Sequence, residues 1–282
     1  MASIRFIAHG IAHLESSVTA APTTQRFARA TDATVRRLGG PSAWSGRSVV
    51  VPALDALVAQ RLAAALAELG AEASEDAPLS PTASPTSRVV DAVELAAWVQ
   101  AVLTTTGRAT NLGFAQASVL VHGAGPRGTL LARRLRDLGA RVRLRSSDRI
   151  ALVVAATSGL EIETSDIVPD HLLFVIATGE DGTFEASSIG AGHGSVVVVD
   201  AAPPGAPPAV AFTAIADEVR PDLLPVVTSG RDAVVLRIED TRDQEYDRAV
   251  ADVRAAFVLL LVADADASAA AADRALAELV LP

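Results

Sequence analysis

The fold is indicated by residues 118–138, which read SVLVHGAGPRGTLLARRLRDL. The first residues form a short apolar run typical of a buried strand, and from Gly128 onward leucines recur at helical spacing. Between strand and helix lies a GxGxxG pattern made by Gly123, Gly125 and Gly128. In this strand–turn–helix context the pattern is typical of a Rossmann-type dinucleotide-binding unit.

Each glycine of this loop has an expected role. Gly123 permits the tight turn, Gly125 lets the backbone approach a pyrophosphate, and Gly128 lets the helix lie close to the strand. Pro126 and Arg127 complete the loop at the helix N-terminus, whose unpaired N–H groups attract phosphates. We therefore expect the loop to bind a nicotinamide dinucleotide. The alternative is a glycine turn of an α/β protein that binds nothing.

The preference between NAD and NADP depends on the end of the second strand, where an acidic residue usually holds the ribose hydroxyls of NAD. Residues 144–149 read LRSSDR, so Ser146 occupies the expected position and Arg145 precedes it. Arginine and serine suit a 2′-phosphate, so this loop, with Ser147, favours NADP over NAD. Two alternatives stay open: Asp148 is the ribose ligand in a shifted register, or Arg145 is a solvated surface charge.

Strands alternating with helices predict a parallel sheet. The fold class is therefore α/β, a Rossmann-type doubly wound parallel sheet with a second, smaller α/β lobe. The smaller lobe is indicated by a β-branched strand at 48–51 and a helix from Pro52 to Leu69. Further apolar strands are expected at 141–144, 172–176, 196–199 and 234–238.

We predict three segments from this pattern. An N-terminal α/β lobe covers 1–103, and the Rossmann domain covers 104–228. Residues 229–282 supply a strand and two Ala-rich helices that pack back on the N-terminal lobe. A stretch rich in Pro, Ser and Thr at 77–87 is a loop or linker, and the helix expected over 89–103 is a candidate hinge.

Composition excludes several classes of function. The 282-residue chain has a net charge of -9, which argues against nucleic acid and anionic membranes as partners. It contains no cysteine, and all 24 basic residues are arginine. Thiolate and Schiff-base chemistry are thus excluded. Without a signal-peptide pattern or a long apolar run, we expect a cytoplasmic protein that binds a small molecule, and Ala-rich helices suggest a homo-oligomer.

The histidines and acidic clusters identify no catalytic residue. His9 and His13 have a spacing that would suit a metal on a helix, but Gly10 lies between them, and we expect no metal site. His122 comes directly before the glycine loop, where it either acts on a ligand or only packs. Acidic residues at 239–247 are interpreted as favouring a helix N-terminus.

Several short segments resemble S-adenosylhomocysteine hydrolase (adenosylhomocysteinase). Residues 108–111 read RATN, as in the segment leading into that family's NAD domain. Ala177, Thr178 and Gly179 are similar to its TATGN turn, although Glu180 stands where Asn is usual. Weaker likenesses are LGAE at 69–72 and TTTG at 104–107. The resemblance implies a bound nicotinamide cofactor contacted by the turn at 177–179.

The departures from that family concern its catalysis. The family's reaction needs a lysine, which this chain lacks. The family's helix-start histidine falls near Leu54, its GHFD segment falls on 201–204, and its acidic NAD residue falls at Ser146. We therefore expect an NAD(P)-binding small-molecule oxidoreductase that is not a standard adenosylhomocysteine hydrolase. The alternative is a non-catalytic dinucleotide-binding or interaction homologue.

Overall fold

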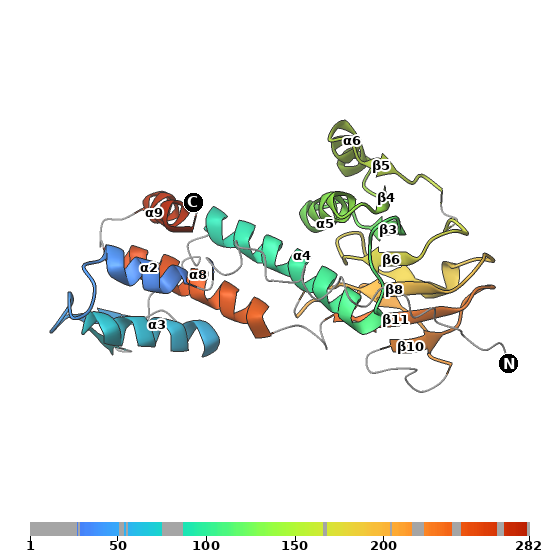
Figure 1. Ribbon diagram of the computed structural model, residues 1–282. Helices are drawn as coiled ribbons and strands as arrows, with labels where there is room; N and C mark the ends of the chain where they lie inside the picture. The colour runs from blue at the N-terminus through green and yellow to red at the C-terminus, as the bar shows by residue number, and fades with distance from the viewer. Residues whose placement is uncertain are drawn as a thin grey trace. The chain divides into compact units, whose positions relative to one another are not determined.

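The structure is a computed structural model (Figure 1). It divides into two compact units, Met1–Val93 with Asp247–Pro282, and Glu94–Tyr246. The residues that it describes are 27, 29–50, 54, 56–74, 87–165, 168–203, 205–215, 223–238, 244–263 and 268–280.

The larger unit is built on a seven-stranded sheet with the order β10-β11-β8-β6-β3-β4-β5. Every pairing in this sheet is parallel except that of β10 with β11. The expected α/β fold with a Rossmann-type parallel sheet is thus confirmed. The strands are β3 (Ser118–His122), β4 (Arg141–Arg145), β5 (Glu161–Ile162), β6 (Phe174–Ala177), β8 (Val196–Asp200), β10 (Leu223–Val226) and β11 (Ala233–Arg237).

Helices cover one face of this sheet. α5 (Pro126–Asp137) and α6 (Arg149–Thr157) lie beside β3, β4 and β5 (Figure 1). Alternation along β3 points Val119 and Val121 into a core that also holds Leu131 of α5. All three side chains have no exposed surface, so this packing ties the first strand of the motif to its helix.

The opposite face of the sheet is covered by short elements. Leu120 of β3 and Val175 of β6 lie in a second core with Phe184, Ile189 and Val210. Those covering residues come from the region of β7 (Phe184–Glu185), η2 (Ala186–Ser188) and β9 (Val210–Ala211). Burial on both faces explains why β6 and the four valines of β8 are apolar in succession instead of alternating with polar residues.

The order of the strands creates a topological switch point beside β3. The chain passes from β3 outward to β4 and β5, then returns to pair β6 on the other side of β3. In such sheets the loops after adjacent strands diverge there and leave a crevice at the carboxyl ends. The glycine loop, the segment after β4 and the segment after β6 therefore meet at one edge.

Two predicted boundaries differ in the structure. The strand expected at 234–238 was assigned to the C-terminal segment, but it is β11 and pairs in parallel with β8, Ala233 opposite Val196. Its Val235 and Leu236 are fully buried in the cores of the sheet, which holds the strand there. The helix expected over 89–103 is α4 (Arg88–Thr110) and includes residues of both units.

The smaller unit combines segments from both ends of the chain. β1 pairs in parallel with β2. Leu62 and Leu66 of α3 share one core with Leu259 of α8, and all three are at most 1% exposed. The elements are α2 (Ala30–Arg37), β1 (Ser48–Val50), α3 (Ala56–Leu69), β2 (Glu72–Ser74), α8 (Gln244–Ala263) and α9 (Ala269–Val280).

Among the helices that the structure describes, α4 alone has the length and composition of a membrane span. Its most apolar window has a mean hydropathy of 1.2, and half of that window is buried inside the protein. Trp98 and Val102 lie in the core of the larger unit. Packing within the protein thus accounts for apolar residues on this helix.

A buried carboxylate caps a helix in the smaller unit. Asp252 of α8 is 2% exposed, and its Oδ2 accepts a hydrogen bond of 2.9 Å from the Thr31 N–H in the first turn of α2. The Thr31 hydroxyl donates to the Asp252 carbonyl oxygen at 2.8 Å, and Arg61 Nε lies 3.9 Å from Oδ1. Burial raises the pKa of Asp252 despite these donors.

Replacing Asp252 tests this cap. Asp252→Ala should lower the free energy of unfolding by about 1–3 kcal/mol, because the Thr31 N–H is left buried without its acceptor. Asp252→Asn keeps an acceptor oxygen and should cost less. Urea denaturation of both variants measures the difference, and equal losses would contradict the capping role.

The raised pKa also predicts a pH dependence. The folded protein takes up a proton at Asp252 at a higher pH than the unfolded chain does, so protonation favours the folded state. As the pH falls from about 7 to about 4.5, the wild type should therefore gain stability relative to Asp252→Asn. Urea denaturation of both proteins at both pH values measures this difference. A wild type that loses stability relative to Asp252→Asn as the pH falls would contradict the prediction.

Candidate functional site

The tight turn after β3 requires glycine at its first position. Gly123 has φ +114°, in the region that favours glycine, and a Cβ there would collide with the Thr178 hydroxyl. Its N–H donates to the carbonyl oxygen of Arg145 at 2.9 Å, continuing the β3–β4 pairing into the loop. The turn thus carries the chain directly into α5.

The two other glycines allow close approach. A Cβ on Gly128 would collide with the carbonyl oxygen of Gly123, so α5 could not begin so close to β3 with any larger residue. A Cβ on Gly125 would lie 2.5 Å from Cδ of Glu180. Gly125 therefore leaves room for an anionic group beside the N-terminus of α5, where Pro126 is the first residue.

The anionic group at this helix end is the carboxylate of Glu180. Its Oε1 accepts a hydrogen bond of 2.8 Å from the Arg127 N–H, and its Oε2 accepts one of 2.9 Å from the Gly128 N–H. The Thr178 hydroxyl lies 3.3 Å from Oε2. Two N–H groups that have no partner within the helix, together with the positive end of the helix dipole, thus converge on one anion.

In the segment after β4, the side chains of Ser146 and Asp148 accept hydrogen bonds from nearby backbone N–H groups. Asp148 accepts from the N–H groups of Ile150 and Ala151 at 2.9 and 3.1 Å, which makes it the N-cap of α6. Ser146 Oγ accepts from the Asp148 N–H at 3.0 Å. The carboxylate of Asp148 is therefore engaged in capping, which argues against its role as a ribose ligand.

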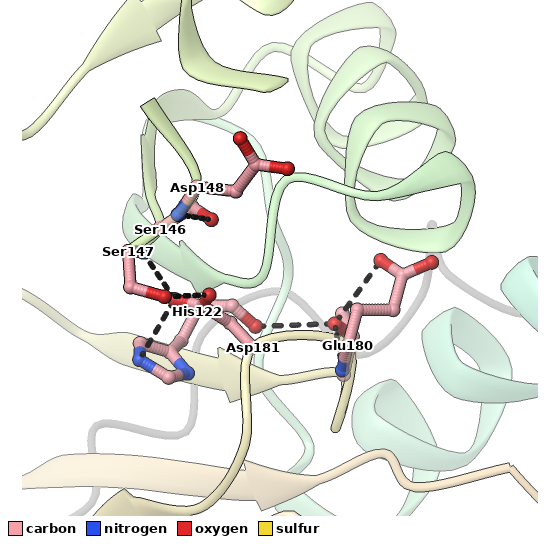
Figure 2. A network of polar contacts seen from close by, with 7 residues as sticks. His122, Ser146, Ser147, Asp148, Glu180 and Asp181 are labelled. Atoms are coloured by element: carbon pink, nitrogen blue, oxygen red, sulfur yellow. Dashed lines mark hydrogen bonds and ion pairs between the residues drawn. The ribbon is translucent and has the colours of Figure 1, made fainter. Parts of the chain in front are cut away.

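A second carboxylate, from the loop after β6, lies against this segment (Figure 2). Asp181 accepts hydrogen bonds from the Ser147 N–H at 2.6 Å and from the Ser147 hydroxyl at 2.5 Å. Burial works to raise the pKa of the Asp181 carboxyl, but hydrogen bonds from Ser147 and Ser146 outweigh it and lower the pKa. Asp181 is thus held as an anion.

His122 completes this polar group at the end of β3. Its Nε2 lies 3.8 Å from Asp181 Oδ2, and its buried Nδ1 has no hydrogen-bond partner in the described part of the chain. Burial and the charge of Arg145 lower the pKa of His122, while Asp181 opposes them. The imidazole is therefore neutral at physiological pH.

Arg145 does not extend as a free surface charge. Its guanidinium lies 5.5 Å from the centroid of the Phe184 ring, and His122 meets the same ring edge-on at 5.5 Å. Phe184 is itself 2% exposed, so this cation–π contact orients Arg145 over the sheet edge. This contact argues against a merely solvated charge, and the role of Arg145 toward a cofactor stays a prediction.

Chemically, this group is not a nucleophilic triad. Asp181 bonds the Ser147 hydroxyl directly and stands between the serine and His122, whereas in a triad the imidazole accepts from the serine. In the part of the chain that the structure describes, no group of three His, Asp or Glu could hold a metal ion. His9 and His13 lie outside the described residues, as do Asp240 and Asp243 of the acidic cluster.

A pocket of about 260 Å³ opens beside the Glu180 carboxylate. Its volume is below the roughly 300–1,000 Å³ typical of sites for drug-sized ligands. As described, it is therefore too small for a whole dinucleotide. Its lining residues come from the glycine loop, the loop after β6 and the loop after β8: Arg127, Thr178, Gly179, Glu180, Gly182, Thr183, Pro203, Ala206, Pro207 and Pro208.

The predicted site residues lie at two neighbouring points of one sheet edge. Register pairing places Ala177 and Arg145 on either side of His122. Sequence reasoning missed the part played by Glu180 and Asp181. The sequence singles out Glu180 only because it stands where the family's TATGN turn has asparagine. No sequence pattern points to Asp181.

No family model matches the chain, and no curated protein matches it. Solved structures resemble it at low identity. The A chain of dipicolinate synthase from Bacillus subtilis is 14% identical over 75% of this chain and 64% of that one, with a TM-score of 0.40. A transhydrogenase from Sinorhizobium meliloti is 19% identical over 76% and 68%, with a TM-score of 0.41. An L-alanine dehydrogenase is 16% identical over 82% and 70%, with a TM-score of 0.40.

These likenesses concern the fold alone. This chain spans less than two thirds of the length of the dipicolinate synthase subunit. None of the three proteins is an adenosylhomocysteinase. The resemblance of residues 108–111 and 177–179 to that family therefore stays a prediction from the sequence.

Alanine at Gly128 tests the close approach of α5 to β3. Gly128→Ala should lower the free energy of unfolding by about 1–3 kcal/mol, because the added Cβ forces the Gly123 carbonyl away. Gly113→Ala is the matched control, since a Cβ there meets nothing within 4 Å and should change stability by less than about 0.5 kcal/mol. Denaturant titrations measure both; equal effects would contradict the packing role.

The imidazole of His122 offers a second test. Asp181→Asn should lower the pKa of His122 further, because it removes the negative charge that favours the imidazolium. An NMR titration of the ring protons measures the midpoint in both proteins. Glu185→Gln, an exposed carboxylate on β7, is the control and should leave the midpoint unchanged. A rise in the Asp181→Asn variant would contradict the assigned contact.

Proposed function

We propose that this chain binds NADP or NAD with the diphosphate at the loop from Gly123 to Gly128. The observation that carries the proposal is the convergence of the Arg127 and Gly128 N–H groups on one anion. A phosphate oxygen has the same requirement for donors as the carboxylate oxygen now held there. The residues of the loop therefore fit a dinucleotide once Glu180 gives up these donors.

The adenosine end of the cofactor would lie at the segment after β4. Arg145, Ser146 and Ser147 offer the donors that suit a 2′-phosphate. The Asp181 carboxylate on Ser147 would repel that phosphate, however, and could accept from a ribose hydroxyl instead. Both nicotinamide cofactors therefore belong to the proposal.

The proposed activity is that of an oxidoreductase on a small molecule bound beside the loop. The cofactor, when bound, supplies hydride transfer. Arg127, Thr178 and Glu180 are polar residues of the pocket and could orient a substrate. The ATG turn supports a relation to the cofactor domain of adenosylhomocysteinase, while the absence of lysine argues against that family's reaction.

A second candidate is a dinucleotide-binding module without catalysis. It is favoured by the pocket, whose described lining contains no histidine and a single carboxylate, Glu180, already bonded to the helix N-terminus. Such a lining is poor in groups for proton transfer. Oxidation of NADH or NADPH by the purified protein with a panel of small carbonyl compounds would favour the enzyme over the module.

Identification of bound nucleotide tests the proposal directly. The purified protein is denatured, and any released NAD or NADP is identified by mass spectrometry. In parallel, thermal shifts are measured with NAD, NADP and S-adenosylhomocysteine. We expect stabilisation by a dinucleotide because a ligand that binds only the folded state raises the melting temperature. No released nucleotide and no shift with either dinucleotide would overturn the proposal.

The binding loop is tested by Gly125→Val. The added side chain fills the space beside the α5 N-terminus and should abolish the shift by dinucleotide. Gly113→Val, at an open position, is the control and should keep it. Binding that survives in Gly125→Val would place the site elsewhere.

A further inference from the structure

The loop after β6 carries two adjacent acidic residues between two glycines, Gly179-Glu180-Asp181-Gly182. The two carboxylates point to different partners, Glu180 away from the group formed by Asp181, Ser147 and His122 (Figure 2). Glu180 bonds the backbone N–H groups of α5, and Asp181 bonds Ser147 after β4. One short loop thus links two anion-accepting points of the crevice.

These two points are the anchors of a dinucleotide in a Rossmann crevice. The diphosphate lies at the helix N-terminus after the first strand, and the adenosine ribose lies at the end of the second strand. Here the first strand is β3 and the second is β4. Glu180 therefore uses the same N–H donors that a diphosphate would need, and Asp181 uses the donors of Ser147 beside the ribose position.

We propose that Glu180 and Asp181 form an internal competitor for the dinucleotide. In the closed state described by the structure, the two carboxylates occupy the anchors of the cofactor. In an open state the loop moves away, and the cofactor takes both anchors. This inference rests on the proposed function, because competition requires that the dinucleotide binds in the same crevice.

The ends of the loop permit such a movement. Gly179 and Gly182 have φ of +75° and +79°, a backbone conformation that larger residues rarely adopt. A Cβ on Gly182 would meet nothing within 4 Å, so the loop faces open space at that position. Glu180 also lines the pocket of about 260 Å³, which offers its side chain space to leave the helix end.

Competition has a quantitative consequence for affinity. The apparent Kd of a ligand rises in inverse proportion to the fraction of protein in the binding-competent state. Charge-assisted hydrogen bonds from two N–H groups favour the closed state. Removing the carboxylate of Glu180 should therefore tighten dinucleotide binding, whereas removing a cofactor ligand would weaken it.

The experiment is a set of calorimetric titrations with NAD and with NADP. The proteins are the wild type, Glu180→Ala, Glu180→Gln, Asp181→Ala and the double variant Glu180→Ala/Asp181→Ala. Glu180→Gln keeps the size of the side chain, in case alanine disturbs the loop. We expect Glu180→Ala to lower the Kd of both cofactors by about tenfold or more. The double variant should lower the Kd of NADP at least as far, because it also removes the Asp181 carboxylate that would repel the 2′-phosphate.

Glu185→Ala is the matched control for charge. It removes one negative charge from an exposed position on β7 and should leave the Kd within about twofold of the wild type, because surface charges are screened. If Glu185→Ala gained as much affinity as Glu180→Ala, the overall negative charge would limit binding, and not the contact of Glu180 with the N-terminus of α5. That result would overturn the internal competitor.

Two further outcomes separate this inference from the proposed function. If the wild type and the Glu180 variants bind a dinucleotide equally well, the competitor is overturned and the proposed function stands. If no protein of the set binds either dinucleotide, the proposed function fails and the competition fails with it. Binding by the wild type that becomes tighter in the Glu180 variants would support both.

Discussion

The close approach of α5 to the end of β3 is the constraint on which the larger unit depends. Gly128 has no side chain, and any Cβ there would collide with the carbonyl oxygen of Gly123. The short turn aims the N–H groups of Arg127 and Gly128 into the crevice between the loops that follow β4 and β6. The core under α5 and the anion site above it thus come from one backbone geometry.

The electrostatics of the crevice follow from that geometry in a chain without lysine. Its two carboxylates are held mainly by backbone N–H groups and a serine hydroxyl instead of by ammonium groups. Arg145 supplies positive charge on the other side, where it also lowers the pKa of His122. Asp181 thus remains charged beside a neutral histidine, which favours a loop of constant negative charge over a proton relay.

Much of the fold was predictable because its signals are local. Strand and helix periodicities indicated β3, α5, β4, β8 and α8, and the glycine spacing indicated the turn. The place of β11 was not predictable, since an apolar strand carries no mark of its partner. α6 also escaped detection, because it is short and its exposed Ile150, Val153 and Val154 blur the amphipathic pattern.

The sequence by itself determined the parallel α/β architecture and the anion-binding loop, because both follow from local spacing and from backbone conformations that glycine allows. Tertiary structure alone decided what that loop holds. Glu180 lies 52 residues after Gly128 and reaches it only because β6 pairs beside β3. Asp181 reaches Ser147 across the same edge. Contacts between loops so far apart depend on the order of the strands, which no local pattern encodes.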